Sequence, residues 1–410
     1  MQLIMGKESD VPQIISKEYK VQKEFTTGGS SAGTLLVTNS DDLQQVLKFS
    51  TWQGIGSSGT PWLKAQASRL IELKRELPYD GSLAIPAVYK TYEDEGLFYY
   101  TFEYFDGLPF SSVNYSDRNF CPGKLATGVS KILDLMTNNF YNQGKLDTPR
   151  SYVENVHLNR ARNRLGLLTS RNSDVFNRFI NGKSIIFDDG DSSDMGSFFG
   201  SLVRLRRIVV NGQVYPNPLD ILKDLDKQEI LDLTPSFIPR YSHGDGTLRN
   251  FLTSPSSDIK IIDVRGVDLP SNTVSRVCIP YELGKMMRTI LLEVIRANDF
   301  LLYCQDSRQD LEFGLKLKEN TNALSFVNAR KDILNAFIDH RDLNALLKDE
   351  GDWVRKTLFA EAIHFLADAV NRLESDDKGK QTLAYFLLGT MLLANYRSNG
   401  GIPSTIKQLR

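Results

Sequence analysis

Apolar and β-branched runs separated by short turns dominate the first hundred residues of the chain. Runs of this length, bounded by Gly, Asn, Asp and Glu, predict β-strands joined as antiparallel neighbours. The predicted strands are Thr34–Thr38, Gln45–Phe49, Leu83–Tyr92 and Leu97–Phe102. Between the second and third strands, leucine and alanine recur at helical spacing, which predicts one amphipathic helix from Pro61 to Leu77.

From Pro122 onwards, the periodicity changes to that of amphipathic helices. The predicted helices are Lys124–Tyr141, Ser151–Leu167, Ile279–Leu301, Trp353–Leu373 and Thr382–Tyr396. The dipeptide Asn211-Gly212 predicts a small hairpin within residues 204–215, and a second hairpin is predicted within residues 299–316. These elements predict an α+β protein, with a small antiparallel-sheet domain at residues 1–107 and a large, mainly helical domain at residues 108–410.

Length and composition are those of an ordinary globular protein with one large or two smaller domains. Of the 410 residues, 41% are hydrophobic and 24% are charged, which permits a substantial buried core. Lys and Arg number 49 against 50 Asp and Glu. The resulting net charge of −1 gives no global reason to expect nucleic acid or an anionic membrane as a partner.

No segment predicts a membrane span. The N-terminal sequence becomes charged too early for a signal peptide. Thr382–Tyr396 is the most apolar segment, and its length of about 15 residues is below the roughly 20 that a spanning helix needs. Cys121, Cys278 and Cys304 have no CxxC spacing, and the chain has four histidines. Free buried thiols in a reducing cytosol are therefore expected, and a zinc cluster is not.

Two further motifs are interpreted as exposed loops. Gly54–Gly59 matches the G-x-G-x-x-G pattern of dinucleotide-binding proteins, but Thr51–Gln53 separate it from the preceding strand. No parallel-strand unit with a ribose-binding acid follows it. The acidic stretch Phe187–Asp194 suggests calcium, but it lacks the Gly and the acid that an EF-hand requires at the sixth and twelfth loop positions.

The candidate chemistry lies between residues 241 and 266. Asp245 precedes Asn250 by five residues, and Asp263 ends a predicted strand, Asp258–Asp263. In phosphotransfer, one carboxylate orients the attacking hydroxyl and accepts its proton, while an Asn and a second carboxylate hold Mg²⁺ on the phosphates. The spacing therefore predicts Asp245 as the catalytic residue and Asn250 and Asp263 as metal ligands.

With His243 and Gly244, the stretch reads H-G-D-x-x-x-x-N followed by I-I-D, and it resembles the aminoglycoside phosphotransferase and choline kinase group of small-molecule kinases. The resemblance implies a two-lobed protein-kinase-like fold and transfer of the γ-phosphate of ATP, with Mg²⁺, to a small-molecule hydroxyl. Ile261–Gly266 and Pro280–Ile290 more narrowly resemble phosphotransferase-like proteins of bacterial capsule and surface-sugar biosynthesis. This narrower resemblance implies a sugar-like acceptor, and the chain departs from it at Val264, where Pro is expected.

The same resemblance implies a phosphate-binding hairpin in the first domain. Backbone N–H groups at Gly28 and Gly29 and the hydroxyls of Ser30 and Ser31 would contact the nucleotide phosphates. Lys48, on the strand that follows, would reach the same phosphates. The alternative from the residues alone is an ordinary hairpin with an exposed lysine.

Phe102–Pro109 resembles the hinge between the two lobes of that group. Its strand ends in aromatic–Glu–aromatic, and Asp-Gly and Pro follow. The resemblance implies that the carbonyl near Glu103 and the N–H near Phe105 read the adenine. A strand that simply ends in a turn is compatible with the same residues.

One position departs from the group. Gln66 stands on the predicted helix where the group has an acid that pairs with the strand lysine, here Lys48. Glu72 and Glu76 point away from the apolar face of that helix. An amide can hydrogen-bond to Lys48 but cannot neutralise it, so either another acid serves or the pair is weaker than usual.

The surroundings of the motif leave the acceptor open. His243 is expected to hold the catalytic loop through hydrogen bonds. Arg249 and Arg265 could bind an anionic acceptor or form structural ion pairs. Three arginines at residues 160–164 are interpreted as a solvated helix face, with a patch that steers a phosphorylated substrate as the alternative.

Two other classes of function stay open. One is a non-catalytic, nucleotide-binding pseudokinase or scaffold, which Gln66 favours and the intact set of Asp245, Asn250 and Asp263 opposes. The other is a kinase or adenylyltransferase that modifies a protein. The first class binds ATP without transfer, and the second leaves a covalent addition on a protein.

Overall fold

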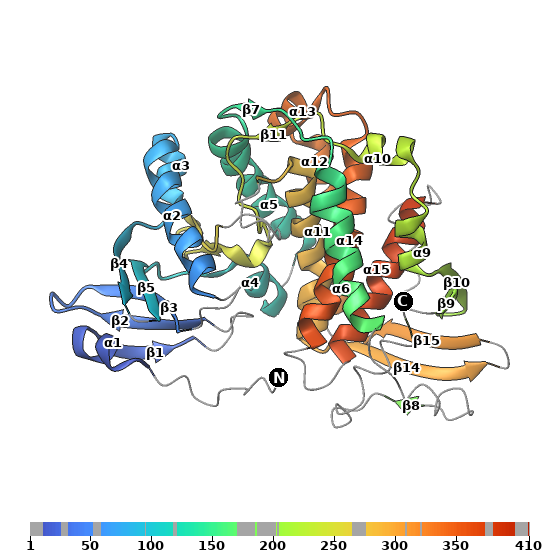
Figure 1. Cartoon of the computed structure of the whole chain (residues 1–410), viewed down its shortest axis with the longest axis horizontal. Helices are drawn as coiled ribbons and strands as arrows, with labels where there is room; N and C mark the ends of the chain where they lie inside the picture. Colours follow the sequence, from blue (N-terminus) through green and yellow to red (C-terminus); the bar gives the residue numbers. More distant parts are fainter. Residues whose placement is uncertain are drawn as a thin grey trace. The chain divides into compact units, whose positions relative to one another are not determined.

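The computed structural model describes residues 11–25, 32–51, 59–94, 96–117, 121–169, 185–186, 202, 205–264, 276–307, 310–319, 322–373, 380–397 and 409. The chain forms two compact units (Figure 1). Unit 1 consists of Met1–Leu108 and Phe251–Val274, and unit 2 consists of Pro109–Asn250 and Ser275–Arg410. The predicted α+β class is confirmed, because unit 1 is built on an antiparallel sheet and unit 2 is mainly helical.

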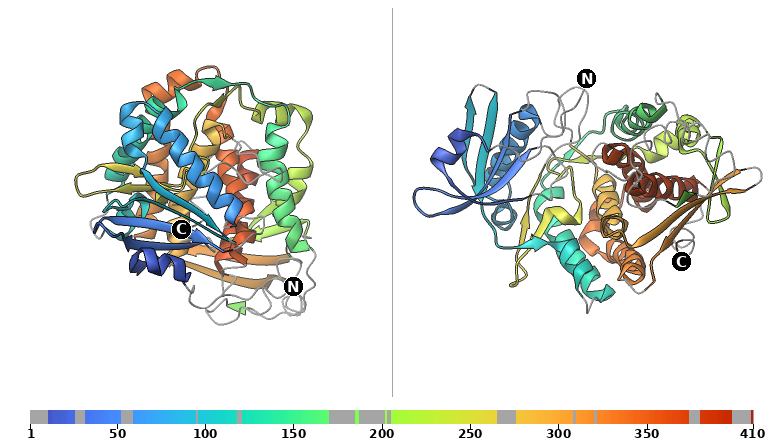
Figure 2. Two further views of the ribbon diagram at one scale, coloured as in Figure 1. Left: turned by 60° about the vertical axis from the view of Figure 1, so that its left-hand side comes forward. Right: turned by 90° about the horizontal axis from the view of Figure 1, so that it is seen from below.

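Unit 1 is a five-stranded antiparallel sheet with helices on both faces. Its elements are α1 (Gln13–Glu18), β1 (Lys20–Glu24), β2 (Gly33–Thr38), β3 (Gln44–Ser50), α2 (Thr60–Glu76), α3 (Tyr79–Ala84), β4 (Val88–Asp94), β5 (Leu97–Glu103), β12 (Phe251–Thr253) and β13 (Ile259–Ile261), and β6 (Leu108–Pro109) spans the boundary along the chain. The strand order is β1-β2-β3-β5-β4. One face carries α2 and the other carries α1 (Figure 2).

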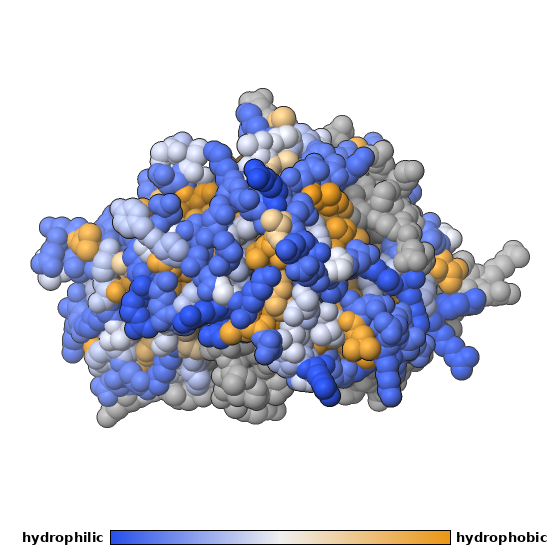
Figure 3. Space-filling model, turned by 90° about the horizontal axis from the view of Figure 1, so that it is seen from above, coloured by the Kyte–Doolittle hydropathy of each residue, from blue (hydrophilic) through white to orange (hydrophobic). Residues whose placement is uncertain are grey.

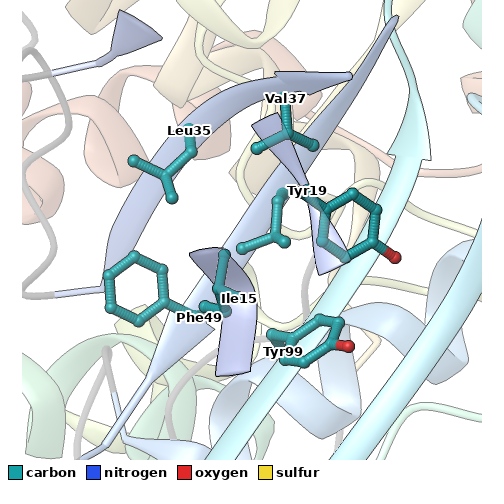
Figure 4. Packing of buried hydrophobic residues seen from close by; sticks show 7 residues of the cluster. Ile15, Tyr19, Leu35, Val37, Phe49 and Tyr99 are labelled. Atoms are coloured by element: carbon teal, nitrogen blue, oxygen red, sulfur yellow. The ribbon is translucent and has the colours of Figure 1, made fainter. Parts of the chain in front are cut away.

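The alternation of side chains along β2 and β3 decides which residues meet each helix. Ile15 and Tyr19 of the α1 segment pack against one face of the sheet (Figure 4). The residues of that face are Leu35, Val37, Leu47, Phe49 and Tyr99. Because successive side chains of a strand point to opposite faces, Lys48 lies on the other face, with α2. The strand period therefore brings Lys48 into the polar network described below.

The predicted strand Leu83–Tyr92 is wrong in its first half. Leu83 belongs to α3, and β4 begins only at Val88. Pro78 precedes α3, and Lys74 of α2 donates to the carbonyls of Ser82 and Ile85, at 2.8 and 2.9 Å. These bonds add a charged donor to carbonyls at the C-terminus of a short helix, so the tertiary contact stabilises a helix in an apolar run.

Unit 2 is a group of helices with a second sheet at one side. Its elements are α4 (Phe110–Ser116), α5 (Pro122–Met136), η1 (Thr137–Tyr141), β7 (Lys145–Leu146), η2 (Val153–Leu158), α6 (Asn159–Thr169), β8 (Ile185–Ile186), β9 (Arg207–Val210), β10 (Gln213–Pro216), α9 (Pro218–Lys223), α10 (Lys227–Leu233), β11 (Ile238–Pro239), η3 (Leu248–Asn250), α11 (Ile279–Arg296), β14 (Phe300–Ser307), β15 (Asp310–Leu317), α12 (Ala323–Asp339), α13 (Arg341–Leu347), α14 (Trp353–Leu373) and α15 (Lys380–Arg397). The two predicted hairpins are β9–β10 and β14–β15, and they join one sheet of order β10-β9-β15-β14-β8. The first hairpin turns at Asn211 and Gly212, which both have positive φ, as a two-residue hairpin loop requires.

Helix α11 is the centre of unit 2. All residues from Ile279 to Ile295 are buried, and the helix packs between α12 and α14 (Figure 1). The approach to α14 is close at Gly284, where a Cβ atom would lie 2.8 Å from the backbone nitrogen of Glu361. In a helix that is buried on all sides, each polar side chain needs a hydrogen-bond or ion-pair partner within the protein.

Seen from above, hydrophobic residues form small separate patches among hydrophilic ones (Figure 3). The predicted solvated face at residues 160–164 is wrong for Arg160 and Arg164, which are only 12% and 19% exposed. None of the helices in the described part of the chain combines the length and hydropathy of a bilayer-crossing segment. Of the predicted buried thiols, Cys278 is buried and its pKa is raised to about 12 by that burial, whereas Cys121 is exposed at the start of α5.

The close packing at Gly284 predicts a large effect of one methyl group. Gly284→Ala is expected to destabilise the protein by about 1–3 kcal/mol, because the added Cβ meets the backbone of α14. Gly123→Ala in α5 is the matched control, since its nearest neighbour would be the Cys121 sulfur at 3.9 Å. The control is expected to keep its free energy of unfolding or to gain about 0.5–1 kcal/mol. Denaturant unfolding measures both, and equal stabilities of the two variants would contradict this packing.

Candidate active site

The residues His243–Asn250, here called the Asp245 loop, lie in unit 2 and are closed by hydrogen bonds around the Asp245 backbone. His243 is fully buried, and its Nδ1 accepts the N–H of Asp245 at 3.2 Å. The Asp245 carbonyl accepts from the Thr247 N–H at 2.6 Å and from the Asn250 side-chain amide at 2.8 Å. The spacing of five residues therefore brings Asp245 and Asn250 into direct contact, and His243 holds the loop as expected.

Lys285 of α11 contacts Asp245 directly. Its ammonium lies 2.6 Å from Asp245 Oδ1 and donates to the Gly244 carbonyl at 3.2 Å. The two side chains are only 6% and 10% exposed, so water screens this ion pair less than a surface pair. The ammonium compensates the charge of a carboxylate that the fold buries, and it holds Oδ1 in place.

The polar residues of α11 recur on one face and hold the whole Asp245 loop. Glu282 accepts the Gly244 N–H, and Thr289 accepts the Leu248 N–H at 3.1 Å. Together with Lys285, these residues are spaced three and four apart, which is the spacing of one helical face. Lys285 is not among the site residues predicted from the sequence. The signal was present as polar residues at helical spacing within an otherwise apolar helix.

Glu282 is a buried carboxyl with a raised pKa. Burial raises the pKa of its carboxyl from 4.5 to about 7, against the opposing effects of hydrogen bonds from Tyr141 and Gly244. The Tyr141 hydroxyl donates to Oε2 at 2.7 Å. Glu282 thus anchors the start of the Asp245 loop at a cost in desolvation.

The two predicted flanking arginines have different outcomes. Arg249 lies 3.6 Å from Glu293 of α11, which also accepts the Ser111 hydroxyl at 2.7 Å. Arg249 thus forms an ion pair within unit 2, and its role in binding an acceptor stays a prediction. Arg265 lies outside the described residues.

In unit 1, Lys48 pairs with Asp263, which follows β13. The Gln66 amide of α2 donates to the same oxygen of Asp263 at 3.2 Å, and the hydroxyl of Tyr100 on β5 donates to Gln66 Oε1 at 2.7 Å. Tyr100 keeps its proton, because burial and then the charge of Asp263 raise its pKa well above the ordinary value. The Tyr100 bond fixes the orientation of the Gln66 amide, so its N–H groups face the carboxylate.

This network explains the departure at Gln66. The acid beside Lys48 is Asp263, and Gln66 supports that acid as a donor instead of competing with it. Asp263 has φ of +54°, in the left-handed region that is uncommon outside glycine, and adopting it costs about 1 kcal/mol. The segment Phe251–Val274, predicted as part of the second domain, belongs to unit 1.

The predicted hinge residues lie at the end of β5. The Glu103 N–H donates to the Ala87 carbonyl at 2.8 Å, and its side chain pairs with Lys260 at 2.8 Å. The Phe105 carbonyl accepts the Gly107 N–H at 2.9 Å. Recognition of adenine by the carbonyl near Glu103 and the N–H near Phe105 stays a prediction. The predicted phosphate hairpin, Gly28–Ser31, and most of the Gly54–Gly59 stretch lie outside the described residues, as does Phe187–Asp194.

The predicted metal ligands have the donor types that Mg²⁺ prefers. Asn250 donates its amide N–H to the Asp245 carbonyl, which orients its oxygen as an acceptor, and the carboxylate of Asp263 lies against Lys48. Within the described ranges, no three His, Cys, Asp or Glu side chains gather into a group that could hold a metal ion. The joint role of Asn250 and Asp263 in holding Mg²⁺ stays a prediction.

Comparisons with known proteins add little to this geometry. No protein-family model matches the chain, and no curated protein matches it. Among solved structures, a MAP kinase from Leishmania major is similar at 10% sequence identity, over 97% of this chain and 90% of that chain, with a TM-score of 0.28. A similarity this low does not define the fold, which follows from the strand order and the helical content of the two units.

The network in unit 1 predicts that an acid is not tolerated at position 66. Gln66→Glu is expected to lose about 1–3 kcal/mol at neutral pH, because a second buried carboxylate replaces the donor to Asp263. The loss is expected to shrink in acid, where the new carboxyl is protonated and can donate. Ser68→Glu on the exposed side of α2 is the control and should change stability by less than about 0.5 kcal/mol. A Gln66→Glu protein as stable as wild type at neutral pH would contradict the network.

Glu282 predicts a specific pH dependence of stability. A carboxyl whose folded pKa is raised stabilises the fold below its unfolded pKa of 4.5, and this stability is lost as the pH rises through about 7. Relative to Glu282→Gln, the wild-type protein is expected to lose about 3 kcal/mol of unfolding free energy over that window. Denaturant unfolding of both proteins between pH 4 and 8 measures the difference. A difference that does not change with pH would contradict the burial of an ionisable carboxyl.

Proposed function

We propose that the protein is an ATP- and Mg²⁺-dependent phosphotransferase that moves the γ-phosphate to a hydroxyl of a small molecule. The observation that carries the proposal is the Asp245 loop, in which a buried carboxylate is held by Lys285 and contacts Asn250 through its own backbone. A carboxylate held in this way can orient a hydroxyl and accept its proton late in the transfer. A loop that served only as a turn would not need to bury a carboxylate, which costs desolvation free energy.

In the proposed reaction, residues of unit 1 bind the nucleotide. Lys48 would contact the phosphates, with Gly28–Ser31 as the proposed backbone donors. Asp263 and Asn250 would hold Mg²⁺, which neutralises phosphate charge when it is bound. Gln66 keeps Asp263 oriented and adds no charge of its own. These roles need no strongly shifted pKa at Asp245, because the proton of the attacking hydroxyl leaves late in the transfer.

The small-molecule acceptor rests on the H-G-D pattern, and the sugar on the narrower resemblance to capsule and surface-sugar biosynthesis proteins. A protein acceptor and a non-catalytic nucleotide-binding protein are the competing functions. Intact-mass analysis after incubation with ATP distinguishes a protein acceptor from a small-molecule acceptor, because a protein substrate would carry a phosphoryl or adenylyl addition. Binding of ATP without turnover across a broad acceptor panel would favour the second.

Asp245→Asn tests the proposal. With ATP, Mg²⁺ and a panel of sugars, amino alcohols and aminoglycosides, the variant is expected to turn over at least about 100-fold more slowly, because it loses the proton acceptor. Nucleotide affinity is expected to stay within a few-fold, since Lys48 and Asp263 are unchanged. Asp258→Asn, in the exposed turn between β12 and β13, is the control and should keep full activity. Unchanged turnover in Asp245→Asn would remove Asp245 from the mechanism.

A further inference from the structure

In unit 1, the ion-pair partner of Lys48 is the carboxylate that is also the predicted metal ligand. Lys48 of β3 and Tyr100 of β5 lie opposite each other in an antiparallel pair, so both side chains point to the same face of the sheet. On that face Lys48 pairs with Asp263. The Lys48 side chain is 14% exposed and that of Asp263 is 33% exposed, so the carboxylate is the more open of the two partners.

Helix α2 places a neutral side chain beside this pair. Gln66 is buried and faces Asp263. The two glutamates of α2 form ion pairs with arginines of the same helix, at 2.7 and 2.8 Å: Glu72 with Arg69, and Glu76 with Arg75. The charges of Lys48 and Asp263 therefore compensate each other, without an acid from α2.

Gln66 holds Asp263 by a contact that does not involve Lys48. The Gln66 amide donates to Asp263 Oδ1 at 3.2 Å, and the Tyr100 hydroxyl fixes that amide by donating to its oxygen at 2.7 Å. The backbone of Asp263 has φ of +54°, a conformation that persists only where the surroundings hold it. If Lys48 moved away, Tyr100 and Gln66 would still hold the carboxylate.

The ion pair conflicts with the proposed roles of its two members. Phosphate oxygens compete with a carboxylate for the same ammonium donors, so Lys48 cannot give all of them to Asp263 and to a nucleotide at once. An ammonium in contact with Asp263 also repels a divalent cation that approaches the same carboxylate. One of the two contacts must weaken when the other forms.

We propose that nucleotide binding exchanges the partner of Lys48: its ammonium leaves Asp263 for the phosphates, and Gln66 keeps the carboxylate in place for Mg²⁺. Gln66 and Tyr100 are then positioning residues for Asp263. Asp263 is a counterion that masks Lys48 until the nucleotide arrives. The exchange rests on the proposed function for the binding of ATP, but it requires no phosphate transfer.

Calorimetry with ATP and no acceptor tests the exchange. In excess EDTA, Asp263→Asn is expected to bind ATP about fivefold or more tightly than wild type, because Lys48 has lost its competing counterion. With Mg²⁺, the same variant is expected to lose most of the affinity that the metal adds in wild type. Asp258→Asn, in the exposed turn of the same segment, is the matched control. It should change either affinity by less than about twofold, since exposed charges are screened.

Lys48→Met separates an exchange of partners from a general loss of negative charge. In the Lys48→Met background, Asp263→Asn is expected to change the affinity for metal-free ATP by less than about twofold, because no masked ammonium is left to release. A gain of equal size with and without Lys48 would overturn the exchange. So would a metal-free affinity of Asp263→Asn that equals that of wild type.

Gln66→Met tests the amide, and it decides the question if Asp263→Asn does not fold. Methionine has a similar length but no donor, so the metal-free affinity is expected to stay and the gain from Mg²⁺ to fall several-fold. Tyr100→Phe removes the hydroxyl that orients the amide and should act in the same direction. Thermal unfolding without nucleotide checks that each variant is folded. If Gln66→Met lowers the metal-free affinity as Lys48→Met does, Gln66 serves the lysine and the proposal is wrong.

The outcomes distinguish the exchange from the proposed function. An exchange detected by calorimetry, without phosphate transfer to any acceptor of the panel, would reject the proposed function and keep the exchange. Transfer by wild type, with equal metal-free affinities in wild type and Asp263→Asn, would reject the exchange and keep the function. Failure of wild type to bind ATP, with or without Mg²⁺, would overturn both.

Discussion

The buried ion pair between Lys285 and Asp245 is the interaction on which the candidate site depends. An aspartate that is only 10% exposed would be costly to bury as a lone charge, and the ammonium of α11 compensates that cost. The same helix accepts the N–H groups of Gly244 and Leu248 through Glu282 and Thr289. The Asp245 loop is therefore held by a helix that is packed on every side.

Local patterns predicted those parts of the molecule that depend on local physics. Residues 353–373 are helical as predicted, and the Asn211-Gly212 turn forms its hairpin, because periodicity and turn chemistry act over a few residues. The contact between Asp245 and Asn250 follows from a spacing of five residues. Helix α3 was missed because Lys74 stabilises it from another element. Strands β9 and β15 pair although they lie about a hundred residues apart, and neither segment contains a sequence pattern that predicts this pairing.

The candidate site shows the same limit. Lys48, Gln66 and Asp263 were singled out by their order along the chain, but the sequence could not tell which acid faces Lys48. That answer required the positions of β3, α2 and the segment after β13, and the Tyr100 hydroxyl that orients the amide. Lys285 lies 40 residues after Asp245 and has no motif of its own. Its role follows from which side of a wholly buried helix faces the loop.

Because Phe251–Val274 belongs to unit 1, this unit folds from two separate stretches of the chain. The smaller unit is discontinuous, so cutting the chain after Leu108 would produce a fragment that retains Lys48 and Gln66 but lacks the carboxylate between them. An autonomous version of this unit would need Leu108 joined to Phe251 by a linker. The long helical segment behaves topologically as an insertion between two strands of the smaller unit. Synthesis must therefore reach Asp263 before Lys48 can meet its partner.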